Sequence, residues 1–270
     1  MKIAFSTLGC PDWNWDLILA TAKDMHFDGI EIRGIANEIY APKIPVFLHN
    51  RIGESMEKLK KMDLEISCLT SACYLFDKNS EERTVAEGME YIDLAGSLGV
   101  PFIRVLGDRD PQPGHDIDDK FVASQLVRLC KYAASRNVTV LIETNGVYAD
   151  SGRLMKLLEL AGSDSVGVLW DVHHPFRYFD EKPEYTYSVL KDRIRYLHVK
   201  DSVVLPDGKS KYRMMGYGDL PLRDIFDILK KANYDGYVTL EWVKRWYSDL
   251  EEPGVVFMQF RSFMNKMLRS

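Results

Sequence analysis

The sequence predicts an α/β protein that folds as a single (β/α)8 barrel over residues 1–270. Short runs rich in valine and isoleucine alternate eight times with segments of helical periodicity. Parallel strands need crossover connections, which are almost always right-handed, so eight successive units close most naturally into a barrel. The length of 270 residues suits this fold, for which about 250 is typical.

A doubly wound open sheet is the alternative architecture. Such sheets often carry a GxGxxG fingerprint after their first strand, where it binds a dinucleotide. The corresponding segment here, Ser6-Thr7-Leu8-Gly9-Cys10-Pro11, lacks that pattern. The barrel is therefore favoured.

The first half of the chain contains four strand and helix pairs. Residues 2–6 form a short apolar strand, and Pro11 can open the helix that follows. Gly99 ends a long amphipathic helix. The expected strands are 2–6, 29–33, 64–69 and 101–106, and the expected helices are 11–25, 52–62, 81–98 and 118–135. The loop 107–116 holds two prolines and two glycines, which suits a lid or rim.

The second half repeats the pattern. Its first strand is a continuous apolar run, typical of a strand buried on both faces, that leads directly into Glu143. The expected strands are 138–143, 166–171, 194–198 and 237–241, and the expected helices are 151–161, 184–190, 221–232 and 255–268.

Each of the last four strands ends in a residue that can bind a metal. These residues are Glu143, Asp171, His198 and Glu241. The carboxyl ends of barrel strands meet at one mouth, so the four side chains should converge. Three carboxylates there would repel one another, and a divalent cation removes that conflict. Alternatively, each residue only ends its strand and caps a helix or pairs with a lysine or arginine, but four such ends in succession favour a metal site.

The ligand set also indicates which metal to expect. Three carboxylates and one imidazole are mainly hard ligands, which favour one Mn²⁺ ion, with Mg²⁺, Co²⁺ and Zn²⁺ as alternatives.

At these motifs the sequence resembles a known family. The motifs are Glu143-Thr-Asn145, Asp171-Val-His-His174, His198-Val-Lys-Asp201, Gly216-Tyr-Gly218 and Leu240-Glu241. Together they are similar to the xylose isomerase-like TIM barrels, which include ketose 3-epimerases, hydroxypyruvate isomerase and inosose dehydratase. The resemblance implies that the four strand-end residues bind a single divalent metal and that His174 contacts substrate.

A metal with open positions can chelate a carbonyl and its neighbouring hydroxyl, so that the adjacent proton becomes removable through an enediolate. Glu143 and Glu241 are the expected catalytic bases: return of the proton from the opposite face gives an epimer, and return to the neighbouring carbon gives an isomer. Lys200 could stabilise an oxyanion or pair with Asp171 or Asp201. The resemblance adds a departure, because the ketose 3-epimerases carry a further Glu and Arg where Ala149 and Val204 stand.

Other polar residues lie on the first strands or in loops. Glu31 and Arg33 end the second strand and Arg104 lies on the fourth, where substrate contact and internal ion pairing are both open. Lys209, Lys211 and Arg213 could meet a substrate phosphate, although a solvated loop is favoured.

The composition argues against some classes of function. The net charge of −5 gives no overall attraction to nucleic acid or to an anionic membrane, and no apolar run approaches a membrane span. Four dispersed cysteines are expected as reduced thiols, and no signal segment is apparent, so a cytoplasmic protein is predicted.

A metal-dependent sugar, sugar phosphate or polyol isomerase or epimerase is therefore favoured, with an inosose-type dehydratase as a close alternative. An endonuclease IV-like DNA-repair enzyme is disfavoured because Arg213-Met214-Met215 replaces its DxH pair. A sugar-binding barrel without catalysis is a third class, which the four metal-binding residues argue against. The substrate and the oligomeric state, a homo-oligomer included, stay open.

Overall fold

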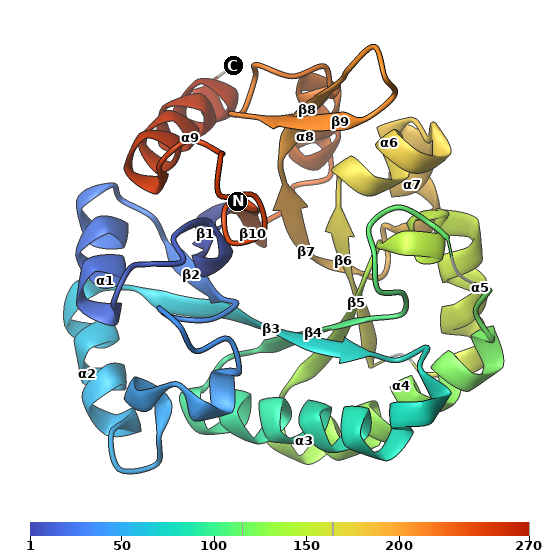
Figure 1. The fold of residues 1–270 in the computed structure, drawn as a ribbon, viewed down its shortest axis with the longest axis horizontal. Coiled ribbons are helices and arrows are strands. Elements are labelled where there is room, and N and C mark those ends of the chain that lie inside the picture. The colour runs from blue at the N-terminus through green and yellow to red at the C-terminus, as the bar shows by residue number, and fades with distance from the viewer. Residues whose placement is uncertain (115, 164, 270) are drawn as a thin grey trace.

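A computed structural model describes residues 1–114, 116–163 and 165–269 (Figure 1). Within these ranges, eight parallel strands close into a barrel in the order β1-β10-β7-β6-β5-β4-β3-β2. The barrel strands are β1 (Lys2–Ser6), β2 (Gly29–Ile32), β3 (Glu65–Tyr74), β4 (Phe102–Leu106), β5 (Thr139–Glu143), β6 (Val166–Asp171), β7 (Ile194–Val199) and β10 (Tyr237–Leu240). This closure confirms the predicted fold class.

Helices surround the strands as an outer ring, which Figure 1 shows in a view into the barrel. They are α1 (Trp15–Asp24), α2 (Ile52–Met62), α3 (Glu81–Leu98), α4 (Asp119–Ala133), α5 (Ser151–Ala161), α6 (His173–Phe179), α7 (Pro183–Leu190), α8 (Leu222–Lys231) and α9 (Pro253–Arg269). Among the residues described, no helix has the length and apolarity needed to cross a membrane.

Two additions to the simple repeat were not predicted. The short helix α6 begins directly after β6, and an antiparallel hairpin of β8 (Asp201–Val204) and β9 (Ser210–Arg213) follows β7. Figure 1 shows the hairpin at the rim of the barrel, beside the C-terminal helix α9. The segment expected as a basic loop is thus partly strand.

The barrel interior has its own apolar layer, separate from the core between strands and helices. This layer consists of Ala4, Cys68, Leu141, Leu169, Tyr196 and Tyr237. Because side chains alternate between the two faces of a strand, a residue two positions further along points to the same side. Leu141, Leu169 and Tyr196 are therefore followed, on the same inward face, by the side chains that end their strands. The buried layer forms the floor of the site.

Candidate metal centre and active site

Four inward-facing side chains converge above this floor. Each of Glu143, Asp171, His198 and Glu241 offers one ligand atom, and these atoms all lie within 4.8 Å of one another. They come from β5, β6, β7 and the end of β10, which are adjacent strands in the barrel. All four are buried. The structure thus brings together the four residues that the sequence singled out.

The environment of His198 suits a bound cation. Its Nδ1 atom makes no hydrogen bond in the described structure, although three carboxylate oxygens surround it. The distances are 3.4 Å to Glu241 Oε1, 3.9 Å to Glu143 Oε1 and 4.0 Å to Asp171 Oδ2. An ion with ligands at about 2.1 Å separates neighbouring ligands by about 3 to 4 Å. These residues can therefore hold a divalent metal.

Glu31 fixes the other side of the same imidazole. His198 Nε2 lies 2.6 Å from Glu31 Oε2, and both side chains are buried. Burial alone would lower the pKa of His198, but the charges of Glu31 and Glu241 raise it to about 9. A carboxylate in this position orients a ligand histidine and increases its basicity. Of the two roles considered for Glu31, the structure shows internal pairing, and Glu31 is not among the residues that line the cavity.

Lys200 lies between two of the carboxylates. Its Nζ atom is 2.6 Å from Asp171 Oδ2 and 2.5 Å from Glu241 Oε2. Burial opposes the charged forms, but the mutual attraction raises the pKa of Lys200 well above its usual value and lowers that of Glu241. Asp171 is thus one of the two partners expected for Lys200. The other, Asp201, instead accepts hydrogen bonds from backbone N–H groups.

Glu143 has a different environment. Arg104 Nε lies 3.1 Å from Glu143 Oε2, and both side chains are almost completely buried. Burial raises the pKa of Glu143 to about 7, because its effect exceeds the opposing charge of Arg104. Arg104 also donates to the Ser71 carbonyl and reaches the cavity wall. Arg104 therefore pairs with Glu143 and also lines the cavity.

His174 borders the metal-ligand cluster from α6. Its Nδ1 atom lies 2.9 Å from the Thr144 carbonyl oxygen, which can accept a hydrogen bond from it. The Nε2 atom makes no hydrogen bond with any described residue and lies 3.6 Å from Asp171 Oδ2. Burial lowers the pKa of His174 to about 4. His174 lines the cavity, whereas its neighbour His173 bonds Ser202 and does not.

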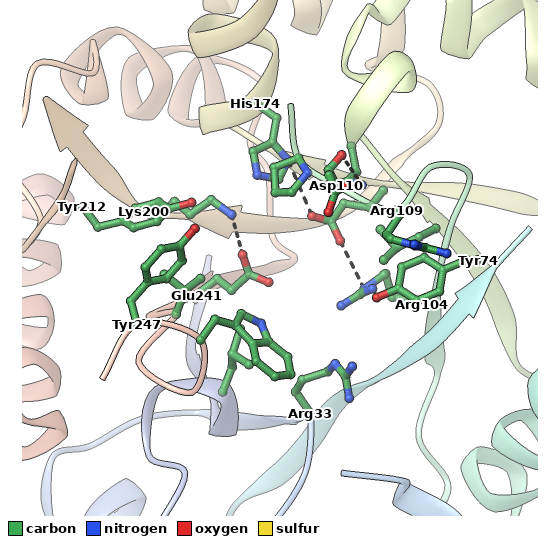
Figure 2. Close-up of a pocket in the computed structure, with 17 residues that line it drawn as sticks. Arg33, Tyr74, Arg104, Arg109, Asp110, His174, Lys200, Tyr212, Glu241 and Tyr247 are labelled. Carbon is green, nitrogen blue, oxygen red and sulfur yellow. Dashed lines mark hydrogen bonds and ion pairs between the residues drawn. The ribbon is translucent and has the colours of Figure 1, made fainter. Parts of the chain in front are cut away.

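A cavity of about 410 Å³ opens above the cluster. Figure 2 shows Glu241 and Lys200 on one side and Arg33, Arg104 and Arg109 on the other. Its lining also includes Tyr74, Asp110, Asn145, His174, Tyr212, Trp246 and Tyr247. The volume lies in the range of small-molecule sites.

Sequence reasoning did not single out several of these wall residues. Arg109 and Asp110 come from the loop 107–116, which was expected at the rim; residue 115 of that loop lies outside the described residues. Tyr212 enters from β9, while Lys211 and Arg213, which flank it, do not line the cavity. Lys209 lines a neighbouring cavity instead. A hairpin signal of alternating residues around Gly208 could have revealed β9.

Comparisons with known proteins agree with this architecture. The family model described as xylose isomerase-like TIM barrel matches residues 19–258. Fructoselysine 3-epimerase from Escherichia coli O157:H7 is 27% identical over 262 residues, which cover 92% of this chain and 93% of the relative.

Two solved structures show the same fold. One is a probable 3-DHS dehydratase, AsbF, from Bacillus anthracis, with a TM-score of 0.81 and 16% identity over 98% of this chain and 99% of the other. The other is the IOLI protein with a binding zinc atom, with a TM-score of 0.79 and 16% identity over 99% and 98% of the two chains.

Proposed function

The chain belongs to the xylose isomerase-like TIM barrel family, and from this premise we propose that it is a divalent-metal-dependent isomerase or epimerase of a sugar, sugar phosphate or polyol. The observation that carries the proposal is His198 Nδ1, which makes no hydrogen bond in the described part of the chain while three carboxylate oxygens lie within 4.0 Å of it. The similarity to a fructoselysine 3-epimerase over nearly the full chain supports a sugar as substrate.

Glu143, Asp171, His198 and Glu241 would hold the ion, with Mn²⁺ first by ligand chemistry. When bound, a divalent metal polarises a substrate carbonyl and so makes the neighbouring C–H acidic. The protein supplies the rest of the chemistry, because the proton must be taken and returned by side chains at fixed positions.

Glu143 and Glu241 would carry out those two proton transfers. Their positions on β5 and at the end of β10, the two ends of the arc β5, β6, β7 and β10, support the assignment of opposite substrate faces to the two carboxylates. One carboxylate removes the proton as a general base. The second returns a proton to the opposite face in an epimerisation, or to the neighbouring carbon in an isomerisation.

Two further side chains would assist. Lys200 places an ammonium group beside Glu241, where it can stabilise negative charge that develops on a substrate oxygen. His174 lines the cavity and, within the described residues, its Nε2 atom has no hydrogen-bond partner, so it can bond a substrate hydroxyl. Burial of both groups keeps these interactions out of bulk water.

A dehydratase is the second candidate, and Lys200 is the observation that favours it. An ammonium group next to a base can protonate a departing hydroxyl after the adjacent proton has been removed. Loss of water would then leave a double bond conjugated with the carbonyl, visible by its ultraviolet absorbance.

The test is proton exchange in D₂O. Metal-loaded protein is incubated with fructoselysine and a panel of ketoses and their phosphates, and deuterium next to the carbonyl is followed by NMR. Glu143→Gln and Glu241→Gln should each lower the exchange rate by about 10² to 10⁴-fold. Glu159→Gln, on the exposed face of α5, is the matched control and should keep the rate. Exchange that is absent from the whole panel, or equal in all variants, would refute the proposal.

A further inference from the structure

The mouth of the barrel has two chemically different halves. The metal-binding candidates and Lys200 belong to the continuous arc of β5, β6, β7 and β10. The other half, formed by β1 to β4 and the loops after them, contributes Arg33, Tyr74, Arg104 and Arg109 to the same cavity. Figure 2 shows these four residues grouped away from Lys200 and Tyr212.

Two cations next to the metal-binding candidates are paired within the protein. Lys200 contacts Asp171 and Glu241, and Arg104 contacts Glu143. Lys200 and Arg104 thus already have carboxylate partners among the metal-binding candidates. Arg33 and Arg109, in the other half, form no such ion pair within the described residues.

Arg33 is buried without a carboxylate partner. Only 7% of the residue is exposed, and its guanidinium donates to the Ile39 carbonyl at 3.3 Å and lies 5.7 Å from the ring of Trp246. In the described structure no acidic oxygen lies within ion-pair distance of it. Burial, and then the positive charge of Arg104, lower the pKa of Arg33. A buried cation without a counterion is costly, so an anion at this place would be bound strongly.

Arg33 also borders a second cavity, which contains Glu87 and Glu90. These carboxylates are engaged elsewhere: Glu90 accepts from the Tyr40 hydroxyl at 2.6 Å, and Glu87 from the Ala72 amide at 3.3 Å. They therefore do not neutralise Arg33.

Arg109 adds a second guanidinium to this wall. It stacks at 5.7 Å from the Phe76 ring, and no ion pair to it is formed within the described ranges. Asp110 is the one acidic residue contributed to the lining by this half, and it is exposed and forms no ion pair with either arginine. Two guanidinium groups that form no ion pair within the described residues thus line one cavity.

We propose that Arg33 and Arg109 form a subsite for an oxyanion, a carboxylate or a phosphate, carried by the substrate at the end distant from the reacting carbons. Guanidinium groups bind both oxyanions through paired N–H donors. The inference rests on the proposed function for the position of the reacting carbons. The substrate class is then an anionic sugar derivative that extends from the metal-ligand cluster to the arginine wall.

The test measures binding without turnover. D-glucitol, D-gluconate and D-glucitol 6-phosphate share a six-carbon hydroxylated chain, lack an aldehyde or ketone group, and differ in their terminal group. They are titrated into metal-loaded protein and again after chelation, with intrinsic tryptophan fluorescence and calorimetry as readouts. Wild-type protein should bind at least one of the anionic polyols about ten-fold or more tightly than D-glucitol. The anionic polyol with the larger increase in affinity over D-glucitol identifies whether phosphate or carboxylate is the preferred group.

Variants locate the site. Arg33→Gln and Arg109→Gln should each remove most of the preference, and Arg33→Lys should keep part of it. Arg109 is exposed, so its variant leaves the fold intact even if replacement of the buried Arg33 disturbs it. Arg223→Gln, on the exposed side of α8, carries the same charge change and should bind as wild type does.

Equal binding of all three polyols to the wild type would overturn the subsite. A preference that survives both glutamine variants, or that disappears on chelation, would place the anion at the metal and also overturn it. Because no probe reacts, a failed deuterium exchange with an intact preference would count against the proposed function alone.

Discussion

Glu31 acts on the site through a residue that it holds, because its carboxylate contacts His198 and not the cavity. Replacement by glutamine keeps the size of the side chain but removes the charge that makes the imidazole a stronger ligand. Glu31→Gln should therefore weaken divalent-metal binding by about 10 to 100-fold. Competition with a chromophoric chelator measures this, with Glu159→Gln as control. Unchanged affinity would show that Glu31 only fills space.

The same imidazole predicts how metal binding depends on pH. A histidine must be neutral to bind a metal, whereas the pKa of His198 is raised to about 9 in the metal-free protein. Below that pH each bound ion must displace a proton, so affinity rises with pH by up to about ten-fold per unit and levels off above it. Glu143, with a pKa near 7, adds a second proton and a steeper slope below neutrality. Mg²⁺ titrations from pH 6 to 10 test this, and a flat profile would contradict it.

At the residue scale, the four strand-end side chains were predictable because strand periodicity places them on the inward face at one end of the barrel. The place of Glu31 was not predictable. It faces inward on β2, and its contact with His198 joins positions 167 residues apart. Nothing local distinguishes such a carboxylate from one that meets substrate. Arg33 is similar, because its lack of a counterion is a property of the folded wall.

At the scale of elements, capping residues and glycines in the sequence predicted where two of the helices begin and end. α3 stops where Gly99 adopts a φ of +67°, and α5 lies between the Asp150 cap and Gly162, so the predicted bounds of both helices are confirmed. α1 begins later than predicted because the Asn14 side chain, rather than the Pro11 turn, caps it by accepting from the Leu17 amide. The β8–β9 hairpin was missed because its strands have only four residues each and resemble a polar loop, so the turn signal at Gly208 between them was not used.

Asp201 connects this hairpin to the segment before α8. Its buried carboxylate accepts from the backbone amides of Gly216 at 2.9 Å and Gly218 at 2.8 Å, and also from Ser202. Gly216 has a φ of +82°, and a Cβ at Gly218 would collide with the Asp201 carboxylate. The two glycines of the Gly-Tyr-Gly motif are therefore needed to bring these amides onto one acceptor.

Removal of that acceptor should destabilise the protein. Asp201→Ala leaves several buried amides without a partner, which predicts a loss of about 3 kcal/mol in the free energy of unfolding. Urea denaturation followed by circular dichroism measures the loss. Asp207→Ala, at the exposed turn of the same hairpin, is the control and should change stability by less than about 0.5 kcal/mol. Equal stability of the two variants would show that the Asp201 network is dispensable.

At the scale of the whole molecule, charge separates a sugar enzyme from a repair nuclease of similar fold. The net charge of −5 provides no general attraction to a phosphate backbone, and the cavity wall offers only two arginines without a counterion in the described structure. A duplex with an abasic site should not be cleaved faster than in a control with metal alone. Gel analysis decides this, and robust incision would move the protein to the repair class.

Metal binding should also stabilise the entire barrel, because the four candidate ligands tie together β5, β6, β7 and β10, half of the closed sheet. Without a cation, three buried carboxylates lie close together and depend on Lys200, Arg104 and His198 for compensation. An ion that binds the native state alone adds about 2.7 kcal/mol to the free energy of unfolding at a hundred times its dissociation constant. This corresponds to a rise in Tm of roughly 5 to 10 °C for a chain of this size.

Elemental analysis should find about one ion per chain, and calorimetry should show the rise with Mn²⁺ and its reversal with a chelator. Asp171→Ala and His198→Ala should lose both the ion and the metal-dependent rise, whereas Glu159→Gln should keep them. If the Tm of the wild type does not change with metal, or if all variants show the same rise, the ion does not bind in this cluster. The basis for the proposed chemistry would then be removed.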